Sequence, residues 1–284
     1  MIVDPWTGVL LLLTAGPLFG GLVFMLLYSI GLAGLLADGF TLHYWLRVMT
    51  DGQTWRSLIY SLFIGGTSLG ASLALALALQ AALGDRLRGS ALSGLLFLPL
   101  AVPPLTAAVL SVEIIGNGGL LSRLAHAAGW IGAPADFPTV LFTPSGIGIV
   151  ITHMTLVTPF LLLLLDRIAA NERLRELTRV AQTLGASHWQ SWRWVALPIL
   201  LRSSAPALTV YSLVLAGAFE IPLIVGAQSP AMISVLIQRR FGQYDLRTRP
   251  EAYALACLYA GLAIGGLLAF SAWRSRRVPR DGRI

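Results

Sequence analysis

Lysine is absent from this sequence of 284 residues, cysteine occurs once, and only 12% of the residues are charged. A P-loop needs a lysine on the nucleotide phosphates, so we do not expect this chain to be the nucleotide hydrolase of any assembly to which it contributes. The single cysteine, Cys257, excludes a disulfide within the chain and a metal site built from several thiolates. Soluble globular domains carry about 25% charged residues, so the scarcity of charge argues against a water-soluble protein.

Long apolar stretches occupy most of the chain. Hydrophobic residues make up 56% of the sequence, and a membrane-crossing helix needs about 20 mostly apolar residues. Six such stretches leave no room for a separate soluble domain, so the sequence predicts an all-α membrane protein with a single transmembrane domain over residues 1–284. Short external helices are expected within 37–56 and 120–128. The predicted spans are 8–36, 57–84, 89–116, 146–168, 203–227 and 252–273.

The net charge of +7 arises from 20 arginines, and their distribution predicts an orientation. If the N-terminus is cytoplasmic, 13 arginines lie in cytoplasmic segments and seven in external ones. Cytoplasmic segments of membrane proteins are enriched in basic residues, so this bias places both termini in the cytoplasm. We interpret the arginines as orientation anchors and a docking surface, and we do not expect nucleic acid as a partner.

The third predicted span contains three prolines within six residues, Pro99, Pro103 and Pro104. Proline inside a helix removes a hydrogen bond and kinks the helix. A membrane tolerates the freed carbonyl groups only where protein or a water-filled path covers them. The pattern therefore predicts a broken helix, which is either a static kink or part of a translocation path.

The most polar helical pattern lies between the fourth and fifth predicted spans, in the segment 170–198. Apolar residues recur there with the spacing of one helix face. Gly185 allows a turn with positive φ, and Ser187 can cap a second short helix. We interpret this segment as a cytoplasmic docking surface; the alternative is an ordinary amphipathic surface helix. The residues of the predicted apolar face are Leu174, Leu177, Ala181 and Leu184.

The spacing of five residues in this segment is specific: Ala181, Gly185, Val195, Leu197 and Pro198. It resembles the coupling-loop signature of type I ABC importer permeases, which have the MetI-like fold. That signature reads Glu-Ala-Ala, three residues, Gly, nine residues, Ile, one residue, Leu-Pro. The chain departs from it at Arg179 and Val180, where the family has Glu and Ala. Three further segments, 217–226, 234–241 and 249–252, resemble the first permease of polyamine-type and ferric-iron-type importers.

This resemblance implies partners and a coupling site. The partners would be a dimer of ATP-binding subunits, a second permease subunit, a periplasmic solute-binding protein and membrane lipid, in the bacterial inner membrane and without a cofactor. The second permease would be a paralogue, with a second copy of this chain as the alternative. Glu176, about one turn before Arg179, could supply the negative charge that the family Glu provides. The residues implied to couple with the ATP-binding subunit are Glu176, Arg179, Val180, Ala181, Leu184, Gly185, Ala186, Ser187, Leu197 and Pro198.

Two carboxylates fall within predicted spans, Glu113 and Glu220. An intramembrane carboxylate is costly and is by default a functional hypothesis. Together with Pro103, these residues are candidates to line the translocation path and to favour a small cation such as a polyamine. Alternatively, Glu220 bonds a neighbouring helix or an arginine. We interpret His153 as a hydrogen-bonded residue between helices.

Two other classes of protein remain as alternatives. A self-sufficient secondary transporter or channel predicts paired intramembrane charges and inverted repeats, and the sequence displays neither. An intramembrane enzyme would need a cluster of catalytic or metal-binding side chains, whereas the four histidines are widely separated and no His, Glu and Asp cluster has metal-ligand spacing. Neither a catalytic site nor a metal site is therefore predicted.

Overall fold

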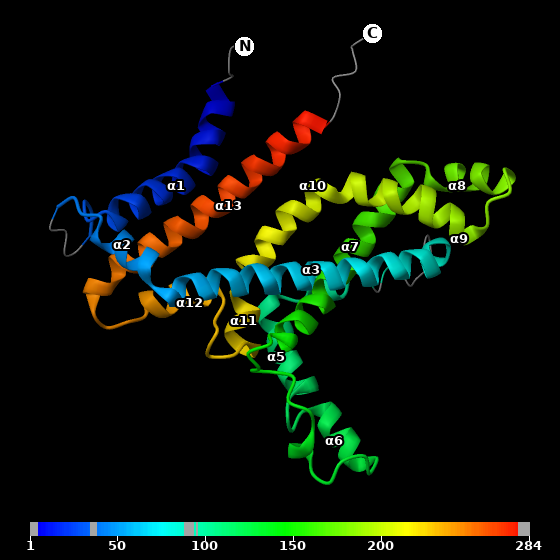
Figure 1. Cartoon of the computed structure of the whole chain (residues 1–284), viewed down its shortest axis with the longest axis horizontal. Helices are drawn as coiled ribbons and strands as arrows, with labels where there is room; N and C mark the ends of the chain where they lie inside the picture. Colours follow the sequence, from blue (N-terminus) through cyan, green and yellow to red (C-terminus); the bar gives the residue numbers. More distant parts are fainter. Residues whose placement is uncertain (1–4, 35–38, 88–93, 95, 278–284) are drawn as a thin grey trace. The chain divides into compact units, whose positions relative to one another are not determined.

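The computed structural model describes residues 5–34, 39–87, 94 and 96–277 (Figure 1). In these residues the regular structure is entirely helical. Six helical segments are long and apolar enough to cross a membrane, which confirms the predicted six-span, all-α fold class. The candidate spans are Leu12–Ser29, Gly52–Gly84, Pro104–Ala127, Ile147–Asn171, His188–Ala216 and Leu246–Arg274.

The chain divides into two compact units, each described here by itself: Met1–Ile59 with Ile233–Ile284, and Tyr60–Met232. In the first unit, α1 packs along α13, and α13 also packs against α2 and α12. The buried side chains of Val48, Ile233 and Leu255 form part of its core. Its elements are α1 (Pro5–Ser29), α2 (His43–Thr50), the start of α3 (Gly52–Leu87), α12 (Ile233–Phe241), the 3₁₀ turn η4 (Leu246–Thr248) and α13 (Arg249–Arg277).

A chain of four charged side chains joins the helices of the first unit. Arg240 on α12 pairs with Asp51, which precedes α3, and donates to Glu251 on α13 at 3.2 Å. Glu251 also accepts from Arg47 on α2 at 2.9 Å. The side chains of Arg240 and Glu251 are only 14% and 13% exposed. Partly buried charges are costly unless they are paired, and these four are paired with one another. We call Arg47, Asp51, Arg240 and Glu251 the first-unit ion network.

The second unit holds most of the remaining helices. Its two apolar clusters contain residues from α3 and α7, and one of them extends to α8 and α10. Its elements are the rest of α3, η1 (Pro99–Ala101), α5 (Pro104–Ile115), α6 (Leu120–Ala127), η2 (Pro134–Asp136), α7 (Ile147–Asn171), α8 (Leu174–Thr183), α9 (His188–Ser191), the π-helical turn η3 (Trp192–Ala196), α10 (Leu197–Ala216) and α11 (Glu220–Val225).

Small and polar residues mark the points where α7 and the residue before it approach α3. Gly146, just before α7, has a φ of +70°, and a Cβ there would overlap the side chain of Ile64 on α3. Farther along, Ser68 Oγ and the buried His153 Nδ1 are 3.0 Å apart. The prediction of a hydrogen-bonded histidine between helices is therefore confirmed.

The structure differs from the predicted spans in two places. In the predicted third span, 89–116, residues 89–93 and 95 lie outside the described residues. The long helix of this span, α5, begins at Pro104, because a turn, η1 and an extended Pro103 precede it, as the prolines predict. The predicted fifth span, 203–227, was wrong as one helix: α10 ends at Ala216 and α11 begins at Glu220. A continuous helix would place the ring of Pro222 against the carbonyl of the residue four positions earlier.

Candidate functional site

The loop between α7 and α10 forms the candidate coupling site. Arg173 adopts a left-handed conformation, with a φ of +50°, and separates α7 from α8. At the base of the loop, Ser203 Oγ on α10 donates to Glu172 Oε1 at 2.8 Å. The contact of α7 with α10, and of α8 with both α7 and η3, makes the loop part of a packed body (Figure 1).

The two sides of α8 have different environments. Leu174 is buried and Thr178 and Ala181 are half-buried, which is the i, i+4, i+7 spacing of one face. Of the residues predicted to share that face, Leu177 and Leu184 instead lie on an adjacent, exposed flank. Their sequence spacing allows either placement, because residues 60° to 80° away around a helix still satisfy a broad apolar pattern. Val180 lies on the same flank, and the three exposed fractions are 44% (Leu177), 58% (Val180) and 84% (Leu184).

Gly185 ends α8 in a defined hydrogen-bonded cap. Its φ is +93°, its N–H donates to the carbonyl of Gln182 at 3.0 Å, and the N–H of Ala186 donates to that of Ala181 at 3.1 Å. These two bonds form a Schellman motif, in which the left-handed position favours glycine. A Cβ at Gly185 would meet nothing within 4 Å, so the local need for glycine in the chain is conformational.

Ser187 caps the second helix of the loop, as predicted. Gln190 N donates to Ser187 Oγ at 3.2 Å, and Ser187 N donates to Gln190 Oε1 at 2.8 Å. This is a capping box, which satisfies two backbone groups reciprocally. Gln190 was not predicted from the sequence, although a Ser followed three residues later by Gln is the signal for a capping box.

The passage from α9 into α10 is a widened helical turn. Trp189 and Trp192 stack with their ring centroids 5.5 Å apart, and η3 then continues directly into Leu197 and Pro198 at the start of α10. Pro198 has no N–H for the carbonyl of Trp194, and its ring crowds that carbonyl. A π-helical turn just before the proline is consistent with relief of this crowding.

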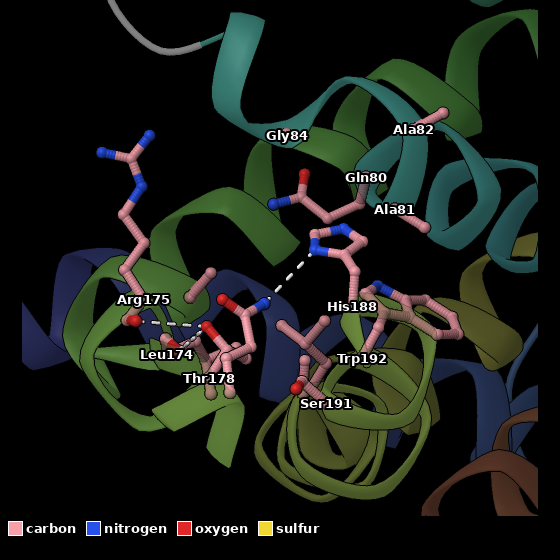
Figure 2. A pocket seen from close by; sticks show the side chains of 14 residues that line it. Gln80, Ala81, Ala82, Gly84, Leu174, Arg175, Thr178, His188, Ser191 and Trp192 are labelled. Atoms are coloured by element: carbon pink, nitrogen blue, oxygen red, sulfur yellow. Dashed lines mark hydrogen bonds between the residues drawn. The ribbon is translucent and has the colours of Figure 1, made fainter. Parts of the chain in front are cut away.

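A cavity of about 320 Å³ lies behind the loop, between α3 and the helices α8 and α9 (Figure 2). Gln80 of α3 faces His188, and Gln182 Nε2 donates to His188 Nδ1 at 3.4 Å. The Oε1 atom of Gln80 is buried and accepts no hydrogen bond from the described residues. Trp192 forms an apolar wall. The coupling loop is thus separated from α3 at this point by space rather than by close packing.

The charges on α8 are solvated. Arg173 and Glu176 form an ion pair at 3.9 Å, with side chains 78% and 70% exposed. Arg179 is exposed and forms no ion pair with another described residue. Exposed pairs of this kind contribute about 1 kcal/mol or less to stability, so these side chains do not hold the loop together.

The predicted path residues lie elsewhere in the second unit. Pro103 is the residue before α5, and Glu113 is on α5. Glu220 is the first residue of α11, which packs against α5 and α7. All three side chains are exposed in the single chain. Within the part of the chain that is described, no group of three His, Cys, Asp or Glu side chains could hold a metal ion.

Comparisons with known proteins show what this chain is similar to. No protein-family model matches the chain. The chain is 27% identical over 261 residues to the inner membrane ABC transporter permease protein YnjC of Escherichia coli (strain K12). The matched region covers 87% of this chain and 47% of that protein. This chain therefore spans about half the length of that relative.

Two solved structures have the same fold. One is a bacterial ABC transporter involved in the import of the acidic polysaccharide alginate, with a TM-score of 0.68, 18% identity and coverage of 98% of this chain and 94% of that chain. The other is a bacterial alginate ABC transporter in complex with an alginate pentasaccharide-bound periplasmic protein, with a TM-score of 0.63, 20% identity and coverage of 98% and 93%. The resemblance to ABC importer permeases is thereby confirmed, and the chain has their fold.

Proposed function

We propose that this chain is the transmembrane permease subunit of an ATP-driven importer. It forms half of the translocation path for a small solute, and a paralogous permease subunit forms the other half. A periplasmic solute-binding protein delivers the solute, and a dimer of separate ATP-binding subunits hydrolyses ATP. The assembly resides in the bacterial inner membrane, with both ends of this chain in the cytoplasm.

One observation carries the proposal. A short helix, α8, connects two candidate membrane spans, is capped at its C-terminus by Gly185 and presents three large apolar side chains to solvent. Exposed apolar surface of this kind marks an interaction site. Its position between two spans suits a part that transmits movement, and the sequence relationship to an ABC transporter permease supports an ATP-binding subunit as the partner.

The coupling step follows from the connections of α8. Because α8 contacts α7 and η3, a displacement of α8 moves both of them, and η3 continues into α10. The bond between Glu172 and Ser203 ties the end of α7 to α10. We propose that closure of the ATP-binding subunits moves this body and so changes the access of the path on α5 and α11.

The proposed path contains Pro103, Glu113 and Glu220, and we propose a small cation such as a polyamine as its solute. Support comes from two exposed carboxylates on helices that pack together, because carboxylates at low dielectric attract cations. The transporters with the same fold import an acidic polysaccharide. A transport assay that compares cations with acidic oligosaccharides will decide between these substrate classes.

Reconstitution tests the function directly. The chain is purified with the proteins that copurify from membranes, and the complex is placed in proteoliposomes with its binding protein. We expect uptake only when ATP is present on the side of the membrane that carries the ATP-binding subunits and the binding protein is present on the other side. Uptake by the chain alone, driven by an ion gradient, would contradict the proposal and favour a secondary transporter.

A further inference from the structure

The exposed part of α8 carries an apolar ridge on one side and an unpaired positive charge on the other. Leu177, Val180 and Leu184 form the ridge. Arg179 is exposed about 100° around the helix from Val180, on the side of α8 opposite the ridge and directed away from buried Leu174. We define Leu177, Arg179, Val180 and Leu184 as the α8 docking face. Its three aliphatic side chains give non-directional attraction, so the arginine must supply most of any directional recognition.

The charge around this face has one sign. From residue 172 to residue 193 the chain has four arginines and two glutamates, a net charge of +2. One of these glutamates, Glu176, is already within 3.9 Å of Arg173. The other, Glu172, accepts the hydrogen bond of Ser203 at the base of the loop. A partner that covers α8 therefore meets a positive surface, and complementary surfaces associate faster and more selectively.

We propose that the α8 docking face fits a groove of an ATP-binding subunit that has an apolar wall and a carboxylate opposite Arg179. This inference rests on the proposed function and adds the chemistry of the partner. An arginine presents a planar fork that a carboxylate can bind with two parallel hydrogen bonds. Arg179 is then the residue by which this permease selects its own ATP-binding subunit and rejects one with a basic groove.

The experiment measures the affinity of the permease in nanodiscs for its ATP-binding subunit. That subunit is identified by copurification with the wild-type chain, sequenced, and then purified separately. For Arg179→Glu we expect affinity to fall by about 10- to 100-fold, since an attractive contact becomes repulsive. Arg179→Lys keeps the charge and loses the fork, so we expect a fall of only a few-fold. The reciprocal change of the partner carboxylate to arginine should restore binding to Arg179→Glu.

Two matched variants separate this inference from the proposed function. Arg202→Glu reverses a charge on exposed α10, outside the docking face, and should leave affinity within about twofold because exposed charges at a distance are screened. Val180→Asp removes part of the ridge and should abolish binding if α8 is the docking element. All variants are exposed, and gel filtration checks that each chain inserts and elutes as wild type.

The outcomes are distinguishable. Loss of binding in Val180→Asp with wild-type affinity in Arg179→Glu overturns the acidic groove and leaves α8 as the coupling element. Wild-type affinity in both variants overturns the acidic groove and the proposed docking role together. If both variants bind the subunit normally but lose thermal stability only in nanodiscs of anionic lipid, α8 faces lipid, and the inference is also wrong.

Discussion

Arginines at helix ends have opposite environments in two regions of this molecule. In the first-unit ion network, Arg240 is 14% exposed and bridges Asp51 and Glu251. In the coupling loop, Arg173 is 78% exposed, and its pair with Glu176 is loose. The first arrangement joins three helices through one guanidinium, whereas the second leaves charge available to solvent or to a partner. The difference separates arginines that hold the fold from arginines that can recognise another protein.

The apolar residues support the same distinction. The first unit buries Val48, Ile233 and Leu255 completely beside its ion network. The coupling loop exposes Leu177, Val180 and Leu184 beside its charges. Burial of a large aliphatic side chain contributes about 1.5 to 3 kcal/mol, so leaving three exposed on one helix flank forgoes considerable stabilisation. Such a flank is expected where a partner completes the burial.

The largest effect is expected from breaking the first-unit ion network. Arg240→Met keeps the length of the side chain but leaves Asp51 and Glu251 without their shared cation. We expect the free energy of unfolding to fall by about 3 kcal/mol, since a partly buried charge then lacks its partner. Thermal unfolding of the purified chain in detergent measures this loss. Arg173→Met, the matched change in the coupling loop, should cost about 0.5 kcal/mol or less.

Equal unfolding temperatures for the two variants would contradict the predicted difference in stability. The double variant Asp51→Asn/Arg240→Met tests whether the ion pair itself supplies the stabilisation. Because the two residues are in direct contact, their effects should be non-additive by about 1 kcal/mol or more. Additive losses would mean that Asp51 acts only by capping α3, where it accepts from Gln53 N at 2.9 Å.

The second prediction concerns Gly185, which shapes the exposed region. Gly185→Asn tolerates the left-handed conformation, so the cap should persist with about 1 kcal/mol of strain or less. Gly185→Asp also tolerates it but adds a negative charge beside the docking face. We expect transport in proteoliposomes to fall by about tenfold or more in Gly185→Asp and by only a few-fold in Gly185→Asn, a difference equivalent to roughly 1 kcal/mol of docking energy. Equal transport in both variants would exclude an electrostatic role for this turn.

Only part of the fold and part of the coupling loop could be predicted from the sequence. The six spans followed from apolar length, and Gly185 and Ser187 followed from cap chemistry, because both depend on local sequence. The flank occupied by Leu177 and Leu184 could not be predicted, since it depends on where α7 and α3 lie beside α8. The separation of α10 from α11 could have been predicted from Pro222, which the apolar pattern concealed.

The first-unit ion network also could not be predicted from the sequence. Asp51 and Arg240 are 189 residues apart, and no local pattern links them. Arg240 was counted only as one of the external arginines. Long-range pairs of this kind depend on the packing of α2, α12 and α13, which only the structure supplies.

The third prediction tests the cap behind the docking face. Ser187→Ala removes the side-chain oxygen that accepts from Gln190 N. We expect the free energy of unfolding to fall by about 1 kcal/mol, the usual cost of a lost N-cap. Transport should fall less than in Gly185→Asp, because the docking face itself is unchanged. Ser271→Ala, which removes an exposed hydroxyl on α13 that donates to the Leu268 carbonyl, serves as a control for the loss of a single hydroxyl group outside the coupling loop.

The last prediction concerns Glu220→Gln, which removes an exposed charge from the second unit without changing the size of its side chain. If Glu220 lines the path, removing its charge should lower the transport rate of a cationic solute by a factor of about 3 to 10, since a carboxylate at low dielectric attracts cations. A neutral solute should be transported at nearly the wild-type rate. Assembly with the ATP-binding subunit and affinity for the binding protein should not change, because Glu220 lies outside the docking face. Proteoliposome uptake of matched cationic and neutral solutes measures the ratio. An equal rate loss for both solutes, or a loss explained by poor assembly, would assign Glu220 to packing of α11 rather than to the path.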